Sequence, residues 1–117
     1  MEEINKGDIF YVDLGKHNKS SIQSGIRPVL IVSNNMCNKY SPTIIVAPLT
    51  SKLKRKDLPV HIELTKDSKN NLELNSVVLL EQLTTIDKKQ ILHKIGEICI
   101  TDLINVNKAL KISLGLF

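Results

Sequence analysis

The sequence contains no tryptophan and only two tyrosines and two phenylalanines. Its core must therefore be built mainly from aliphatic side chains, and few rings remain on which nucleic-acid bases could stack. Long apolar runs are also missing, because no stretch approaches the ~20 residues that a membrane-spanning helix needs. The acidic start, MEEINKGD, lacks the apolar segment of a signal peptide. We therefore expect a cytoplasmic protein with no membrane partner.

The two cysteines, Cys37 and Cys99, lie far apart and show neither CxxC spacing nor clustered histidine partners. This pattern gives a zinc site little support. We expect both side chains to be buried as small hydrophobic groups. We expect neither a metal ion nor another cofactor.

Acidic residues are absent from residues 14–56, although the same segment carries eight basic ones. The formal net charge of +4 arises wholly in the first half of the chain. Residues 1–60 hold nine Lys and Arg against five Asp and Glu, whereas residues 61–117 hold seven of each. Such asymmetry favours a surface that binds an anion, although a solvated, lysine-rich surface would give the same pattern. The eight basic residues are Lys16, Lys19, Arg27, Lys39, Lys52, Lys54, Arg55 and Lys56.

The composition is otherwise that of an ordinary globular protein, with 42% hydrophobic and 24% charged residues. A chain of 117 residues can build one modest core, so we expect a single domain over residues 1–117. Short segments rich in β-branched and aromatic residues follow one another, with turn signals between them. We predict strands at residues 8–14, 28–33, 43–50, 59–64, 76–82 and 93–98, and one helical turn at KKQIL.

Two of these segments carry further local information. Pro48 cannot donate to a ladder, so it marks an edge, a bulge or a strand end, and Thr50 follows where regular pairing fails. In PVHIEL, residues 59–64, the period of two directs the aliphatic side chains inward and His61 to the opposite face.

The last segment changes to a helical period. Thr101 can cap a helix that Gly115 would end. Its apolar face contains Leu103, Val106, Leu110 and either Ser113 or Leu114. We therefore predict an α+β fold that is mostly β, with a small, strongly bent antiparallel sheet or open barrel and a C-terminal helix. The apolar tail ISLGLF could serve the monomer core or a dimer interface.

The segment SGIRPVLIVSN places Arg27 directly before Pro28. Proline restricts the preceding residue to extended conformations, so the guanidinium of Arg27 starts from a narrow set of positions. An Xaa-Pro pair can also simply open a strand. Because consecutive strands often lie side by side, Arg27 should lie near Thr50. A guanidinium, a hydroxyl and a basic loop would together suit a phosphate group.

Six segments along the chain form an ordered set: GDIFYVDL, SxQSGIRPVLIVSN, SPTIIVAPLTSK, LPVHIEL, NSVVLLEQLTTIDKKQIL and ALKISLGL. In order and spacing they resemble the MazF/PemK/Kid family of toxin endoribonucleases, particularly its Gram-positive MazF members. The resemblance covers roughly residues 6–116.

The resemblance implies an SH3-like barrel of the CcdB/PemK type, a homodimer, and sequence-specific, metal-independent cleavage of single-stranded RNA. It also implies a cognate antitoxin whose disordered segment folds over the basic groove. The family's GxRP arginine falls on Arg27 and its strand-end threonine on Thr50. By this analogy both are catalytic. Attack by a 2′-hydroxyl on the adjacent phosphorus would leave a 2′,3′-cyclic phosphate and a 5′-hydroxyl.

Recognition of RNA would use groups that reach base edges and phosphates. Family members often carry Gly-Ser-Glu-Gln before the GxRP stretch, whereas this chain has no carboxylate there, because Ile22 stands in that region. Arginine is a poor general base, and His17 in the same loop could titrate usefully, although a solvated histidine is the commoner case. The resemblance and the charge pattern point to Ser21, Gln23, Ser24, Lys52, Lys54, Arg55, Glu81 and Gln82 as substrate-binding residues.

Other interpretations fit parts of the pattern. The KLKRK run could be a solvated turn, Thr50 a strand-end cap, and the Glu81 and Gln82 pair a cap on neighbouring backbone. On the level of function, the alternatives are a non-catalytic RNA-binding module, a CcdB-like poison of a protein target, and an interaction domain with solvated basic loops.

Overall fold

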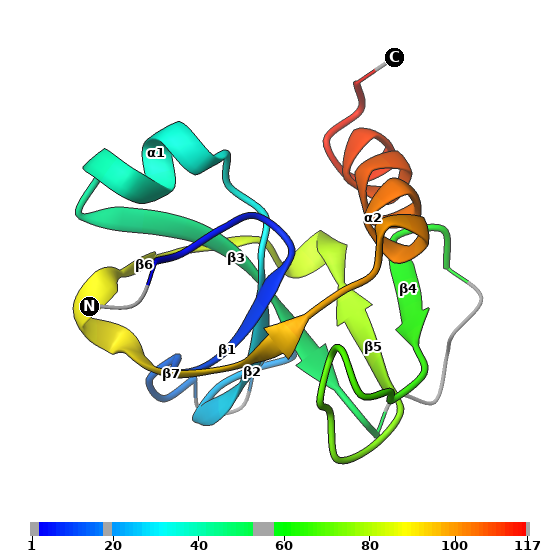
Figure 1. Cartoon of the computed structure of the whole chain (residues 1–117), viewed down its shortest axis with the longest axis horizontal. Helices are drawn as coiled ribbons and strands as arrows, with labels where there is room; N and C mark the ends of the chain where they lie inside the picture. The colour runs from blue at the N-terminus through cyan, green and yellow to red at the C-terminus, as the bar shows by residue number, and fades with distance from the viewer. Residues whose placement is uncertain (1–2, 18–19, 53–57, 117) are drawn as a thin grey trace.

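The computed structural model describes residues 3–17, 20–52 and 58–116. Within them the chain forms seven strands, two α-helices and two short 3₁₀ helices (Figure 1). The strands are β1 (Asp8–Asp13), β2 (Ile26–Ile31), β3 (Thr43–Thr50), β4 (His61–Leu64), β5 (Ser76–Leu79), β6 (Thr84–Asp87) and β7 (Ile91–Glu97). The helices are α1 (Asn35–Tyr40), η1 (Leu80–Gln82), η2 (Lys88–Gln90) and α2 (Ile100–Ser113).

All pairings in the sheet are antiparallel. The strand order is β4-β5-β3-β2-β1-β7, and β6 pairs with β3 beside this path. The sheet curls strongly, and α2 packs at the end that holds β4 and β5 (Figure 1). The predicted fold class, a mostly β open barrel with a C-terminal helix, is confirmed. Neither α-helix among the described residues is long and apolar enough to cross a membrane.

Buried aliphatic side chains form two clusters on opposite faces of the central strands. Ile9 belongs to the cluster under α2, whereas its neighbour Phe10 belongs to the second cluster. Leu30 and Ile31 divide in the same way. Because successive side chains of a strand point to opposite faces, both faces of these strands are covered. This explains why residues 29–31 of β2 and 46–49 of β3 are continuously apolar and buried rather than alternating.

Pro48 lies inside β3, at the point where the strand changes partner. The ladder with β2 ends at the pair Val29 and Pro48, and the ladder with β5 begins at Leu49 and Val78. A residue without an N–H suits such a junction. The irregularity predicted at Pro48 is therefore a change of partner within one strand, and Thr50 is still paired, with Val77.

Some sequence predictions need correction. The strand expected over residues 76–82 ends at Leu79, and residues 80–82 form η1. Helix α1 was not predicted; Asn34 caps it by accepting a hydrogen bond from the Cys37 amide at 2.9 Å, a signal that the sequence does contain. Cys37 is exposed and Cys99 is half-buried, so neither is the buried hydrophobic group expected. A six-residue helix on the surface buries too little to cover Cys37.

Helix α2 begins at Ile100 rather than after Thr101, because Cys99 is the N-cap residue and its carbonyl accepts from Leu103 N. Gly115 ends the helix with a φ of 66°, as predicted. Of the two residues that could complete the inward face of α2, Ser113 or Leu114, it is Ser113 that faces the fold. Its hydroxyl donates to Leu80 O at 2.7 Å. Leu114 is 57% exposed.

The loop between β4 and β5 is organised around Asn70, which is only 1% exposed. The Asn70 side chain accepts from Asp67 N and Leu72 N and donates to Thr65 O. The loop docks on β7, where the Glu97 amide donates to Lys69 O at 3.2 Å. A Cβ atom on Gly96 would lie 2.5 Å from Asn70 O. A glycine is therefore required for this close approach of two backbones.

Replacing Gly96 with alanine should destabilise the protein, because the added methyl group must displace the backbone of the docked loop. We expect a loss of about 1–3 kcal/mol, the range found for overpacking. Thermal unfolding checks this expectation. Leu92→Ala, at a 51% exposed position on the same strand, is the matched control and should change stability much less. Equal midpoints for Gly96→Ala and wild type would show that the loop is not held by this approach.

Candidate active site

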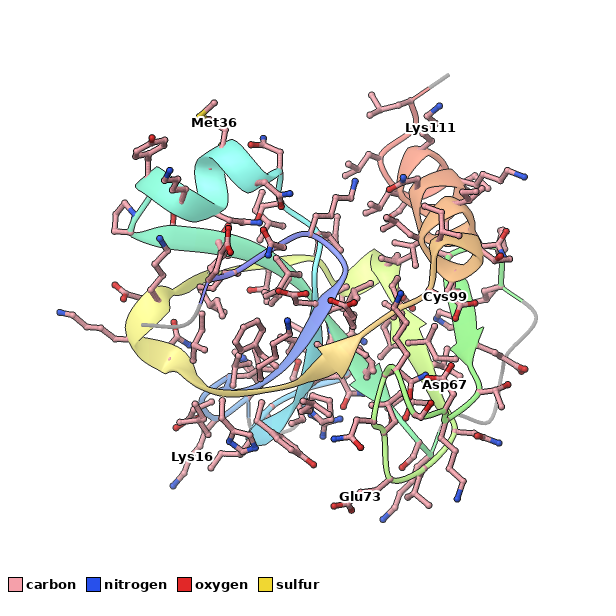
Figure 2. The ribbon with its side chains drawn as sticks, viewed as in Figure 1. Lys16, Met36, Asp67, Glu73, Cys99 and Lys111 are labelled. Carbon is pink, nitrogen blue, oxygen red and sulfur yellow. The ribbon has the colours of Figure 1, made fainter. Side chains whose placement is uncertain are left out.

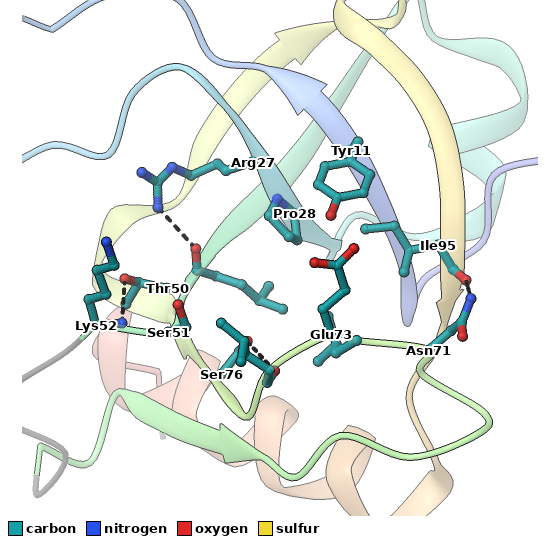
Figure 3. A pocket seen from close by; sticks show the side chains of 13 residues that line it. Tyr11, Arg27, Pro28, Thr50, Ser51, Lys52, Asn71, Glu73, Ser76 and Ile95 are labelled. Carbon is teal, nitrogen blue, oxygen red and sulfur yellow. Dashed lines mark hydrogen bonds between the residues drawn. The ribbon is translucent and has the colours of Figure 1, made fainter.

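An open pocket of about 310 Å³ lies where the start of β2, the end of β3 and the β4–β5 loop meet (Figure 3). This volume is at the lower end of small-ligand sites. Its wall is both polar and apolar. The lining residues are Tyr11, Arg27, Pro28, Leu49, Thr50, Ser51, Lys52, Asn71, Leu72, Glu73, Leu74, Ser76 and Ile95.

Arg27 is anchored by two backbone carbonyls. Its Nε donates to Ser24 O at 3.0 Å and its Nη1 donates to Leu49 O at 3.2 Å. A guanidinium has five N–H donors, so several stay available to a ligand in the pocket. Burial lowers the pKa of Arg27 from its ordinary value, yet arginine keeps its charge at neutral pH. The pocket therefore contains a pre-positioned cation.

Thr50 reaches the same pocket from the last position of β3. The register between β2 and β3 pairs Val29 with Pro48, and its continuation sets Arg27 opposite Thr50. Adjacent strands thus bring the two residues together, as the sequence predicted. The Thr50 hydroxyl accepts a hydrogen bond from Lys52 N at 3.3 Å. That bond uses the oxygen as acceptor and leaves the hydroxyl proton for an anionic ligand.

The loop that leads into Arg27 is held by Gln82. Gln82 Oε1 accepts from Gln23 N at 2.8 Å, and its Nε2 donates to Ser21 O at 3.1 Å. Ser24 contributes the carbonyl that accepts from Arg27. Of the two interpretations of Gln82, the structure favours a cap on neighbouring backbone. Ser21, Gln23 and Ser24 lie in this braced loop next to the pocket rather than in its wall.

Glu81 pairs with His61. The two side chains meet at 2.5 Å between Nε2 and Oε2, with His61 3% and Glu81 39% exposed. The expectation that His61 faces away from the interior is wrong, because Glu81 contacts it at the start of β4, whereas Glu63, two residues further on, is exposed as alternation predicts. Glu81, the partner of His61, lies on η1 next to Gln82, the residue that holds the loop before Arg27.

The remaining predicted site residues divide by position. Lys52 lines the pocket, and its side chain is exposed. Lys54 and Arg55 lie outside the described residues. His17 is exposed. Among residues 3–17, 20–52 and 58–116, no group of three His, Cys, Asp or Glu side chains is arranged to hold a metal ion.

Among the pocket residues that sequence reasoning missed, two carry polar groups that could contact a ligand. Tyr11 comes from β1 and Glu73 from the β4–β5 loop, and both face the cavity in Figure 3. The position of Glu73 depends on how the loop folds around Asn70 and docks on β7. Nothing in the residues around Glu73 signals that outcome.

The fold and the pocket define a class of protein: a small, bent antiparallel barrel with a cation and a hydroxyl set at one open pocket. Residues 5–114 match the PemK-like, MazF-like toxin family of type II toxin-antitoxin systems. This protein belongs to that family.

Known relatives agree with the assignment. Endoribonuclease MazF of Staphylococcus epidermidis is 43% identical over 113 residues, which cover 97% of this chain and 92% of that protein. A mycobacterial endoribonuclease solved with its cognate antitoxin has a TM-score of 0.76 at 26% identity, over 100% of this chain and 98% of its own. MazF from Deinococcus radiodurans shares the fold, with a TM-score of 0.82 at 21% identity, over 99% and 100% of the two chains.

Proposed function

We propose that this protein is the toxin of a toxin-antitoxin system and cleaves single-stranded RNA at a specific sequence, without a metal ion. The observation that supports this most strongly is the placement of Arg27 and Thr50 on one open pocket. Membership of the toxin family and the 43% identity to a staphylococcal endoribonuclease agree with it.

In the proposed reaction the 2′-hydroxyl oxygen attacks the adjacent phosphorus. The O2′–P bond forms as the 2′-hydroxyl loses its proton, the P–O5′ bond breaks, and the departing O5′ takes up a proton. The products are a 2′,3′-cyclic phosphate and a 5′-hydroxyl. Negative charge rises on the non-bridging oxygens as the phosphorane forms. Groups that are fixed in advance to receive this charge lower the barrier.

Arg27 and Thr50 are the two groups that meet this charge in our proposal. The guanidinium is held by Ser24 O and Leu49 O, so little reorganisation is needed when charge develops. The Thr50 hydroxyl donates its proton to a non-bridging oxygen while it accepts from Lys52 N. Each such donor contributes about 10²–10³-fold in rate.

The proposed partners are RNA, a cognate antitoxin and a second copy of the chain. The open pocket and the exposed Lys52 suit RNA, and an antitoxin with a disordered segment could cover the same surface. Exposed apolar side chains favour a homodimer. Met36 on α1 is 69% exposed and Ile100 on α2 is 68% exposed, and Met36 projects outward in Figure 2.

Incubation of the purified protein with a long RNA in excess EDTA tests the proposal. We expect discrete fragments whose new ends are 2′,3′-cyclic phosphates and 5′-hydroxyls, and sequencing of the 5′ ends should show one shared recognition sequence. RNA that is retarded in a gel but stays intact would indicate a binding module instead. In either case the affinity should fall with salt, with a log–log slope of about −0.7 for each phosphate contacted.

A further inference from the structure

The pocket has two chemically different sides. Thr50 and Lys52 lie on one side, with Arg27 above them, and Glu73, Tyr11 and Ile95 lie on the other (Figure 3). The proposed cleavage chemistry uses only the first side. The second side combines a carboxylate with an aromatic ring and apolar surface, which is a common composition for a site that holds a base.

Glu73 points into the pocket from a loop that is firmly held. Asn70 ties the loop together from inside, and the adjacent Asn71 donates from Nδ2 to Ile95 O at 3.2 Å. The Glu73 side chain itself has no hydrogen bond or ion pair among the described residues. Glu73 is exposed, so its carboxylate is an acceptor that is open to a ligand and that the fold itself does not use.

A carboxylate in a pocket for RNA is costly unless something donates to it. It repels the phosphates that Arg27 attracts, and ionised carboxylates can only accept hydrogen bonds. RNA can supply 2′-hydroxyls and the amino and imino groups on the Watson–Crick edges of unpaired bases, and only the base groups differ from one nucleotide to the next. Adenine, cytosine and guanine each carry an exocyclic amino group, whereas uracil presents a single N–H between two carbonyl oxygens.

Tyr11 provides a wall for such a base. Its ring packs against His93, with centroids 5.0 Å apart and an interplanar angle of 48°. This contact supports the ring from the neighbouring strand, β7. Pro28 and Ile95 add apolar surface on either side of the Glu73 carboxylate (Figure 3).

We propose that Glu73 is a specificity-determining residue: it accepts a hydrogen bond from the amino group of a base beside the scissile linkage and excludes uracil from that position. The inference rests on the proposed function, because it takes the pocket to bind RNA at the point of cleavage. Rejection of uracil comes from repulsion between the carboxylate and its carbonyl oxygens, a form of discrimination against the wrong partner.

The substitution Glu73→Gln tests the role of Glu73 in base selection separately from the cleavage chemistry at Arg27 and Thr50. The amide has nearly the same shape but can both donate and accept, so it can pair with uracil. Wild type and variant are incubated with RNA that is randomised around the cut, and the fragments are sequenced. At one position near the cut, wild type should disfavour uracil about 10-fold or more, as expected for a good base contact. Glu73→Gln should accept uracil there within a few-fold.

A matched control and a binding assay complete the experiment. Glu3→Gln removes the same charge at an exposed site that shares no residue with this pocket, and its profile should equal that of wild type. Binding is also measured with oligonucleotides that carry a 2′-deoxy residue at the cut and either adenine or uracil at the selected position. The variant should lose the preference for adenine even if its cleavage is slow.

The outcomes distinguish the two proposals. Identical base preferences for wild type and Glu73→Gln, in both cleavage and binding, would overturn the role of Glu73 while leaving the ribonuclease intact. A wild-type protein that binds oligonucleotides selectively but cuts no RNA would instead overturn the proposed function.

Discussion

Arg27→Ala should lower the rate of RNA cleavage by about 10³-fold, the upper part of the range for one preorganised donor, because it removes both a charge and several donors from the transition state. Single-turnover cleavage of a defined RNA measures the effect. Arg27→Lys should recover only part of the rate, since an ammonium group keeps the charge but cannot reproduce the planar fork of donors.

Lys16→Ala is the control for this prediction. Lys16 is exposed and lies outside the pocket, so its loss removes one positive charge without touching the site. The mass in solution and the unfolding midpoint of Arg27→Ala should stay close to wild type, because the Arg27 side chain lies at an open pocket and its hydrogen bonds go only to the carbonyls of Ser24 and Leu49. Normal cleavage by pure, folded Arg27→Ala protein would contradict the proposed mechanism.

Thr50→Val should slow cleavage by about 10²–10³-fold, because it keeps the shape of the side chain and removes the hydroxyl that donates to the phosphate. Thr50→Ser restores the hydroxyl and should retain most of the activity. The same single-turnover assay gives both rates.

The competing role of Thr50 as a strand-end cap predicts a different result. Loss of the 3.3 Å bond from Lys52 N would cost roughly 0.5–1.5 kcal/mol of stability and leave the rate almost unchanged. Thermal unfolding of Thr50→Val measures this loss of stability separately from the cleavage rate. A stability loss without a rate loss would assign Thr50 to the fold alone.

Local sequence patterns predicted most of the barrel. Every predicted strand segment overlaps an observed strand, although β6 was not predicted as a strand, and Gly115 ends α2. Helix α1 was missed despite its local capping signal, whereas two other errors fall where tertiary contacts override local preference. His61 is buried against Glu81, and residues 80–82 leave the sheet to form η1.

Part of the candidate site was also predictable from local sequence patterns. Arg27 and Thr50 lie on consecutive strands, so a local rule of adjacency sufficed to bring them together. Gln82 acts across the fold on the loop at Gln23. Glu73 enters the pocket only because its loop docks where Gly96 lacks a side chain. Neither relationship has a signal in neighbouring residues.

The sequence by itself determined the mostly β composition, the acid-free basic half and the stiff placement of Arg27 before Pro28, because these depend on residue type and nearest neighbours. Only the tertiary structure decided that β3 changes partner at Pro48, that His61 meets Glu81, and that Glu73 faces the same cavity as Arg27. Those outcomes depend on the bend of the sheet and on the register between distant segments. Both emerge from packing the whole chain at once.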